Sequence, residues 1–127
     1  MTHRRINAGV AARIGTYSDA VETAAGTRLL LTSGTPGLDD AGELPADFSE
    51  QAELAWQNIR AILAEAGMGI EDIVRINQFL TRREDLDSYR AIRARHLGDA
   101  RPASTLLFVD ELIWPDMLIE IEVVAAR

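Results

Sequence analysis

The clearest pattern in the chain begins after residue 47, where apolar residues recur every three or four positions. This period is typical of an amphipathic helix, and the residues that follow it are Phe48, Ala52, Ala55, Ile59, Ile62, Leu63 and Ala66. Asp47, with Glu50 three residues later, fits a capping box at the start, and Gly67 fits a left-handed end. The pattern therefore predicts a helix from about residue 48 to about residue 66.

Strands and a second helix are expected on either side of this helix. The predicted strands cover residues 28–33, 73–80, 105–109 and 118–125. A turn-rich loop over 34–42 follows the first strand, and the second helix is expected over 85–97, with Gly98 and Pro102 at its end. Its apolar face contains Leu86, Tyr89, Ile92 and Leu97. This order of elements predicts an α+β fold with both helices on one face of a sheet.

The last predicted strand has two different faces. Alternation places Met117, Ile119, Ile121 and Val123 toward the helices, and Leu118, Glu120, Glu122 and Val124 on the other side. The second face suits a surface partly buried by a partner and partly lining a wet cleft. Glu120 and Glu122 point the same way, roughly 7 Å apart by strand rise. Such a pair can support acid–base chemistry, but spacing alone favours the alternative, a solvated pair without a function.

Composition narrows the class of protein. The chain has 127 residues, of which 47% are hydrophobic, and shows no repeat or linker, so we expect one domain covering 1–127. The net charge of −7 makes nucleic acid an unexpected partner. The arginines near the second helix fit a solvated face. The N-terminus lacks the apolar core of a signal peptide and no run is long enough to span a bilayer, which predicts a soluble cytoplasmic protein without a membrane partner.

Several kinds of chemistry find no support in the sequence. There is no cysteine, so disulfides and thiolate nucleophiles are excluded. His3 and His96 are the only histidines, and no acidic residue stands at a metal-ligand spacing from either, so no metal is implied. No serine lies in a nucleophile-elbow context, and residues 34–37 are too short for a phosphate loop. No cofactor is expected. Trp56 and Trp114 are interpreted as packing residues, with Trp114 a candidate for a subunit interface.

Four segments together indicate a known family. They are Ile14-Gly15-Thr16-Tyr17-Ser18-Asp19-Ala20-Val21, Leu31-Thr32-Ser33-Gly34-Thr35, Arg101-Pro102-Ala103-Ser104-Thr105, and the stretch from Pro115 to Ala125. They resemble the signature of the RidA (YjgF, endoribonuclease L-PSP) family over nearly the whole chain. The resemblance implies a chorismate-mutase-like fold with two helices on one face of a six-stranded mixed sheet. It also implies a homotrimeric barrel with ligand clefts between neighbouring subunits.

The resemblance assigns roles to four residues. Glu120 matches the cleft glutamate, and Tyr17 matches a tyrosine that reaches the cleft. Gly34 matches a glycine that lets the backbone approach a ligand, and Thr35 follows it where the family usually has glutamine. Without the resemblance, Tyr17 reads as a half-buried residue that holds a loop, and Gly34 as the first residue of a turn.

One substitution separates this chain from the imine-hydrolysing members. Where they carry the arginine that binds the substrate carboxylate, this chain has Ser104, which offers one neutral donor. Arg90, on the second helix where relatives often place an asparagine, is a candidate replacement, and the alternative is an exposed helix arginine. Arg101 is a further candidate, although a structural contact before Pro102 is favoured.

Two classes of function follow for a small-molecule ligand. The first is hydrolysis of an enamine, imine or related metabolite, a deaminase-type reaction, in which Glu120 positions water beside Ser104 and the substrate lacks the usual α-carboxylate. The second is a non-catalytic homotrimer that binds a metabolite or acts as a chaperone-like or regulatory partner. Ribonuclease activity is a weaker third, because the acidic chain has no pair of catalytic histidines.

Overall fold

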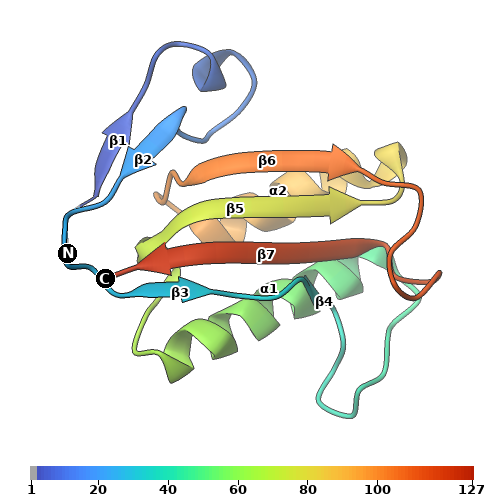
Figure 1. The fold of residues 1–127 in the computed structure, drawn as a ribbon. Helices are drawn as coiled ribbons and strands as arrows, with labels where there is room; N and C mark the ends of the chain where they lie inside the picture. Colours follow the sequence, from blue (N-terminus) through green and yellow to red (C-terminus); the bar gives the residue numbers. More distant parts are fainter. Residues whose placement is uncertain (1–2) are drawn as a thin grey trace.

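A five-stranded sheet and two helices form the body of the protein in the computed structural model, which describes residues 3–127. The sheet contains β3 (Leu29–Leu31), β4 (Thr35–Pro36), β5 (Ile73–Leu80), β6 (Ala103–Phe108) and β7 (Ile119–Ala126). The helices are α1 (Phe48–Glu65) and α2 (Leu86–Leu97), and β1 (Arg4–Ile6) pairs with β2 (Ala20–Glu22) in a separate ribbon. Short 3₁₀ turns cover Ala11–Arg13, Ile70–Asp72 and Arg83–Asp85. Figure 1 shows the four longer strands side by side in the order β3-β7-β5-β6.

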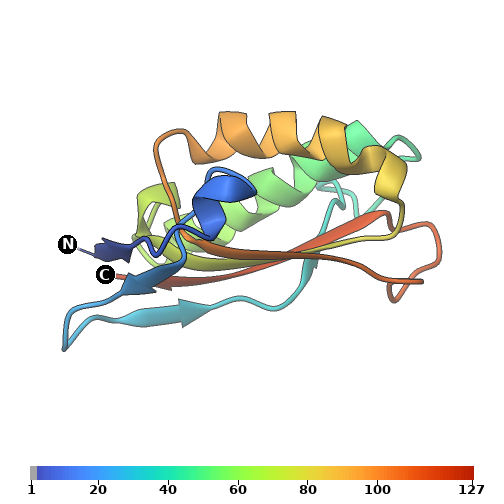
Figure 2. The ribbon, with the colours of Figure 1, turned by 90° about the horizontal axis from the view of Figure 1, so that it is seen from above.

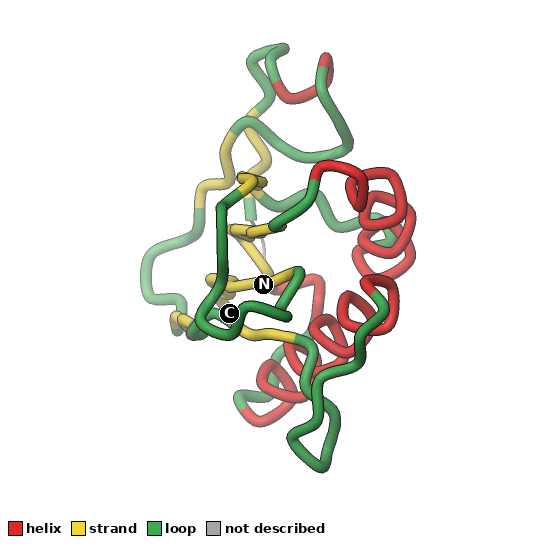
Figure 3. The backbone as a smooth tube through the Cα atoms, turned by 90° about the vertical axis from the view of Figure 1, so that its right-hand side faces the viewer, coloured by secondary structure: helices red, strands yellow, loops and turns green. Residues whose placement is uncertain are grey.

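The sheet is mixed, and its two faces differ. Strand β5 runs parallel to β6 and antiparallel to β7, while β3 and β4 both pair antiparallel with β7. Both helices cover one face and leave the other uncovered (Figures 2 and 3). The β7 residues predicted to face the helices are buried, and Glu120 lies on the uncovered face, which we call the open face. The predicted α+β architecture and the alternation of the last strand are confirmed.

Local sequence signals explain both helices. The Asp47 carboxylate accepts a hydrogen bond from the backbone N–H of Glu50 at 3.1 Å, which satisfies one free donor at the start of α1. Gly67 follows its end with φ +69°, a left-handed conformation that favours glycine. Gly98 ends α2 with φ +55°. The helices therefore begin and end within about one residue of their predicted bounds.

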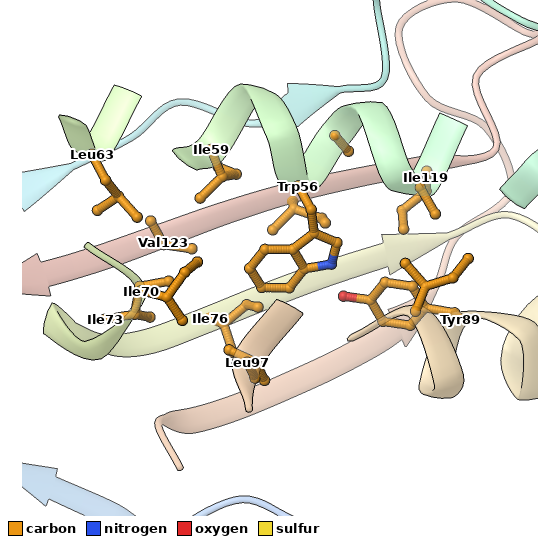
Figure 4. Packing of buried hydrophobic residues seen from close by; sticks show 14 of the residues in the cluster. Trp56, Ile59, Leu63, Ile70, Ile73, Ile76, Tyr89, Leu97, Ile119 and Val123 are labelled. Carbon is orange, nitrogen blue, oxygen red and sulfur yellow. The ribbon is translucent and has the colours of Figure 1, made fainter. Parts of the chain in front are cut away.

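The core lies between the helices and the sheet. Trp56 from α1, Tyr89 from α2 and Ile76 of β5 are fully buried and belong to one cluster (Figure 4). Burial of such aromatic side chains dominates core energetics, and truncating one to alanine costs about 3–5 kcal/mol. The Trp56 ring also stacks on His96, with 5.6 Å between ring centroids. Trp56 is thus a packing residue, as predicted.

The sheet has five strands, where six were expected, because the β1–β2 ribbon joins it at one point only. Ser18 forms a single bridge to Ala103 of β6. The next residue, Asp19, turns its carboxylate toward the preceding loop, where it accepts hydrogen bonds from the backbone N–H groups of Ala8, Gly9 and Ala11. The single bridge between this segment and β6 does not extend into a ladder. No helix within residues 3–127 is long and apolar enough to cross a membrane.

Candidate functional site

Glu120 lies directly over Gly34 on the open face. The short β4–β7 ladder pairs Pro36 with Glu120, which brings the loop before β4 against the carboxylate. A Cβ atom built on Gly34 would stand 1.6 Å from Glu120 Oε1, so no side chain fits between them. Thr35, the next residue, is buried and donates from its hydroxyl to the Ser33 carbonyl at 3.1 Å. The absence of a side chain at Gly34 thus leaves room for the Glu120 carboxylate. We call Gly34 and Glu120 together the carboxylate half.

The two carboxylates on β7 have unequal surroundings. Burial raises the pKa of Glu120, and the neighbouring Glu122 carboxylate raises it further. Glu122 has a donor of its own, because Asn77 Nδ2 donates to its Oε1 at 3.0 Å. Within residues 3–127, Glu120 accepts no such side-chain hydrogen bond. A carboxylate whose pKa is raised and which has no fixed partner is a stronger base than an ordinary glutamate, so Glu120 is suited to accept a proton from water.

A second feature lies on the helix side of the sheet. It is a cavity of about 200 Å³ that we call the donor pocket, lined by Ile14, Gly15, Tyr17, Leu86, Arg90, Arg93, Ser104 and Leu106. Three of the residues predicted for the site, Tyr17, Arg90 and Ser104, therefore meet in one place. The side chains that line this pocket carry two guanidinium groups and two hydroxyls, and none carries a carboxylate.

Ser104 is held by a buried hydrogen-bond network that the sequence did not reveal. The side chain of Gln78 is fully buried, and its Nε2 donates to Ser104 Oγ at 2.9 Å and to the Thr105 carbonyl at 3.1 Å. Its Oε1 accepts from the Tyr89 hydroxyl at 2.7 Å and from Arg93 Nη1 at 3.2 Å. The sequence did contain one indication of this network: Gln78 places an amide at a helix-facing position of a strand whose other helix-facing residues are apolar.

Ser104 and Glu120 cannot share a water molecule within one chain, so the water expected between them stays a prediction for a cleft between subunits. Ser104 bonds to Gln78 on the helix side, whereas Glu120 pairs with Phe79 of β5 on the open face. Because neighbouring residues of a strand point to opposite faces, the two groups lie on opposite sides of the sheet. The carboxylate half and the donor pocket of one chain therefore do not form a common cavity.

The other basic candidates have defined contacts. Arg101 Nη1 donates to the carbonyls of Gly98 and Ala100, both at 2.8 Å, so this guanidinium binds the chain just after α2, which is the structural role that the sequence favoured. Arg90 lines the donor pocket with a half-exposed side chain, 3.9 Å from the Asp87 carboxylate. Arg90 is thus available to a ligand, whereas Arg101 is engaged by backbone oxygens.

Other side chains lie apart from these two features. His96 Nε2 contacts the Glu53 carboxylate at 2.7 Å, and within the described residues no three acidic or histidine side chains gather as metal ligands would. Trp114 is about half exposed. A larger cavity of about 750 Å³ lies between β1 and the end of α2, and of the residues considered for the site only Arg101, which is engaged by backbone oxygens, lines it. This cavity is therefore not assigned to the predicted reaction, although it is larger than the donor pocket.

Comparison with known proteins connects these features to a family. The family model described as endoribonuclease L-PSP matches residues 8–127. A RutC family protein of Pyrococcus horikoshii is 32% identical over 115 residues, which cover 90% of this chain and 89% of the relative. The structure of YyfB, a Rid family protein of unknown function from Yersinia pestis, superposes with a TM-score of 0.87 at 29% identity, with full coverage of both chains.

A further solved structure is that of Escherichia coli TdcF with bound serine, with a TM-score of 0.74, 28% identity and coverage of 98% of this chain and 94% of TdcF. The family match extends over nearly the whole chain and includes both the carboxylate half and the donor pocket. With the shared α+β fold, it establishes that this chain belongs to the RidA (YjgF, endoribonuclease L-PSP) family.

Proposed function

We propose that the protein is a homotrimer that hydrolyses an enamine or imine of a small metabolite, in clefts where the carboxylate half of one subunit faces the donor pocket of the next. The observation that carries this proposal is the position of the two features on opposite faces of one sheet. A second copy of the chain is then needed to bring Glu120 near Tyr17 and Ser104. Homologous proteins named as deaminases of reactive intermediates support the reaction class.

The composition of the open face supports assembly. Leu29 and Leu31 of β3 and Leu107 of β6 are 61%, 69% and 50% exposed, and ladder pairing places them on the open face with Val124 and Phe79. An apolar sheet surface of this kind is favourable to bury against identical surfaces of other copies. The polar residues Asn77, Glu120 and Glu122 lie among these apolar ones, as expected for a surface that is part interface and part cleft.

The proposed imine hydrolysis uses the carboxylate half for proton transfer and the donor pocket for substrate binding. In the proposed cleft, Glu120 accepts a proton from a water molecule as the water oxygen bonds to the imine carbon, and this proton passes to the nitrogen. Collapse of the carbinolamine breaks the carbon–nitrogen bond and releases ammonia and a carbonyl compound. Tyr17, Arg90 and Ser104 orient the substrate by donating hydrogen bonds, and Gly34 keeps the backbone close to it. Recognition differs from that of relatives with the arginine, because Ser104 offers one neutral donor.

Two measurements test the proposal. Analytical ultracentrifugation at micromolar concentration should give the mass of a trimer. Ammonia release should be measured from imines and enamines formed in the assay mixture, both with an α-carboxylate, such as 2-aminoacrylate, and without one. Glu120→Gln should remove most of the activity and leave the trimer intact. A trimer that binds metabolites but hydrolyses none of these imines would instead favour the non-catalytic function, and a stable monomer would remove the proposed cleft.

A further inference from the structure

Every polar side chain that lines the donor pocket can donate a hydrogen bond. Gln78 Nε2 already donates to Ser104 Oγ, so the Ser104 hydroxyl proton is free to point elsewhere. The Tyr17 hydroxyl and the guanidinium groups of Arg90 and Arg93 complete the set. In a chain of net charge −7, a pocket with two cations and no carboxylate in its lining is complementary to an anion.

Arg93 is the more firmly held of the two cations. It projects from α2, which lies behind β5 and β6 (Figure 1), and its Nη1 donates to the buried Gln78 Oε1 at 3.2 Å. Its guanidinium carbon also lies 5.7 Å from the centre of the Tyr89 ring. Within the described part of the chain, Arg93 makes no ion pair with a carboxylate, so its charge is not compensated locally.

The buried amide links this arginine to the serine. Tyr89 and Arg93 both donate to Gln78 Oε1, which fixes the amide so that its Nε2 faces Ser104. A fully buried glutamine with both ends bonded is rigid, because every change of its orientation leaves a buried polar group without a partner. The guanidinium and the hydroxyl are therefore held on either side of one amide, both lining the same cavity of about 200 Å³.

We infer that Arg93, positioned by Gln78, takes the place of the missing strand arginine and binds the carboxylate of the substrate together with the Ser104 and Tyr17 hydroxyls. This inference rests on the proposed function and specifies its substrate class as small carboxylates, in contrast to the substrate without a carboxylate that Ser104 alone suggested. A guanidinium that uses one N–H for Gln78 keeps four others, enough for a bidentate contact with a carboxylate. Arg90 also lines the pocket, but its half-exposed charge lies near Asp87 and is screened by water, so it contributes little to the preference.

The probe is pyruvate, and pyruvamide is its neutral counterpart of nearly equal shape. Both are titrated into the full-length assembly and followed by two-dimensional ¹H–¹⁵N NMR. Wild-type protein should bind pyruvate at least about tenfold more tightly than pyruvamide, as expected for a charge-assisted contact. Arg93→Gln should bring this ratio close to one. The matched control is Arg95→Gln, which lies on the same helix but pairs with Glu53, and it should keep the wild-type ratio.

A second measurement needs no substitution. The side-chain Nε–H resonance of Arg93 in wild-type protein should shift on addition of pyruvate and not of pyruvamide, whereas that of Arg95 should not shift. If the Arg93 resonance does not move at saturating pyruvate, or if Arg93→Gln keeps the wild-type ratio, the inference is overturned. The double variant Arg93→Gln/Ser104→Arg should regain the preference for pyruvate, a rescue that a purely structural role for Arg93 does not predict.

The inference and the proposed hydrolysis can fail separately. Imine turnover with an unchanged KM in Arg93→Gln would overturn the role of Arg93 and leave the hydrolysis in place. Arg93-dependent binding of pyruvate without any imine turnover would leave the carboxylate site in place and remove the hydrolysis.

Discussion

Gly34→Ala changes the carboxylate half without touching Glu120 itself. The added Cβ would stand 1.6 Å from Glu120 Oε1, and ordinary contact begins near 3.4 Å, so the carboxylate must move by the difference of about 1.8 Å. The backbone of Gly34 does not have a positive φ, so alanine fits its conformation. The free energy of unfolding should therefore change by less than about 1 kcal/mol, whereas displacement of a reacting group by about 1 Å costs on the order of 100-fold in rate.

We expect kcat/KM for imine hydrolysis to fall about 100-fold in Gly34→Ala, equivalent to about 2.7 kcal/mol of transition-state stabilisation. The control is Gly42→Ala, where φ is +76° and nothing lies within 4 Å of the added Cβ. This variant should lose about 1–2 kcal/mol of stability and keep its activity per folded protein. Ammonia release and urea denaturation measure the two quantities. If Gly34→Ala keeps kcat/KM within about threefold of wild type, the contact between Gly34 and Glu120 does not position the reacting carboxylate.

Two further substitutions test the core and the electrostatics. Gln51 is fully buried and bonds to the Pro45 and Asp116 carbonyls and to the Leu118 N–H, so Gln51→Leu should cost about 2–4 kcal/mol in urea denaturation, whereas exposed Gln57→Leu should cost less than about 0.5. Burial, and then Glu122, raise the pKa of Glu120 above its ordinary value of 4.5, so the stability that its protonated form contributes is present below that pH and is lost as pH rises through the folded pKa. Glu120→Gln lacks this loss, and its free energy of unfolding should gain on that of wild type from pH 4.5 to 7. A difference that stays constant over this range would show that Glu120 is solvated like an ordinary carboxylate.

Local signals were enough to predict most of the fold. The period of α1, the Asp47 cap and the glycines at 67 and 98 act within a few residues, so the sequence placed both helices closely. Strand β5 covers the predicted residues 73–80. The number of strands in the sheet was wrong because the segment before β2 makes only a single bridge to β6, and the pairing of segments far apart in sequence is not encoded in the periodicity of either one.

The candidate site was only partly accessible from the sequence. Family resemblance singled out Tyr17 and Ser104, and the structure brings them together with Arg90. The role proposed for Arg93 was not predicted, because it depends on Gln78, which contacts Arg93 from a strand 15 positions away in sequence. The water shared by Glu120 and Ser104 stays a prediction for a cleft between subunits, because the two residues lie on opposite faces of one sheet and alternation does not predict how subunits assemble.

In the proposed trimer, each site combines Glu120 of one subunit with the donor pocket of another, and mixing two inactive variants shows whether the site is shared in this way. Glu120→Gln lacks the carboxylate, and Ser104→Leu fills the donor pocket with an isobutyl group. If the two are denatured together in equal amounts and refolded into mixed trimers, roughly a quarter of the interfaces should combine an intact carboxylate with an intact pocket, and imine hydrolysis should recover to about a quarter of the wild-type value. Each variant refolded alone should stay inactive. Mixed trimers that are no more active than the separate variants would contradict a site shared between subunits.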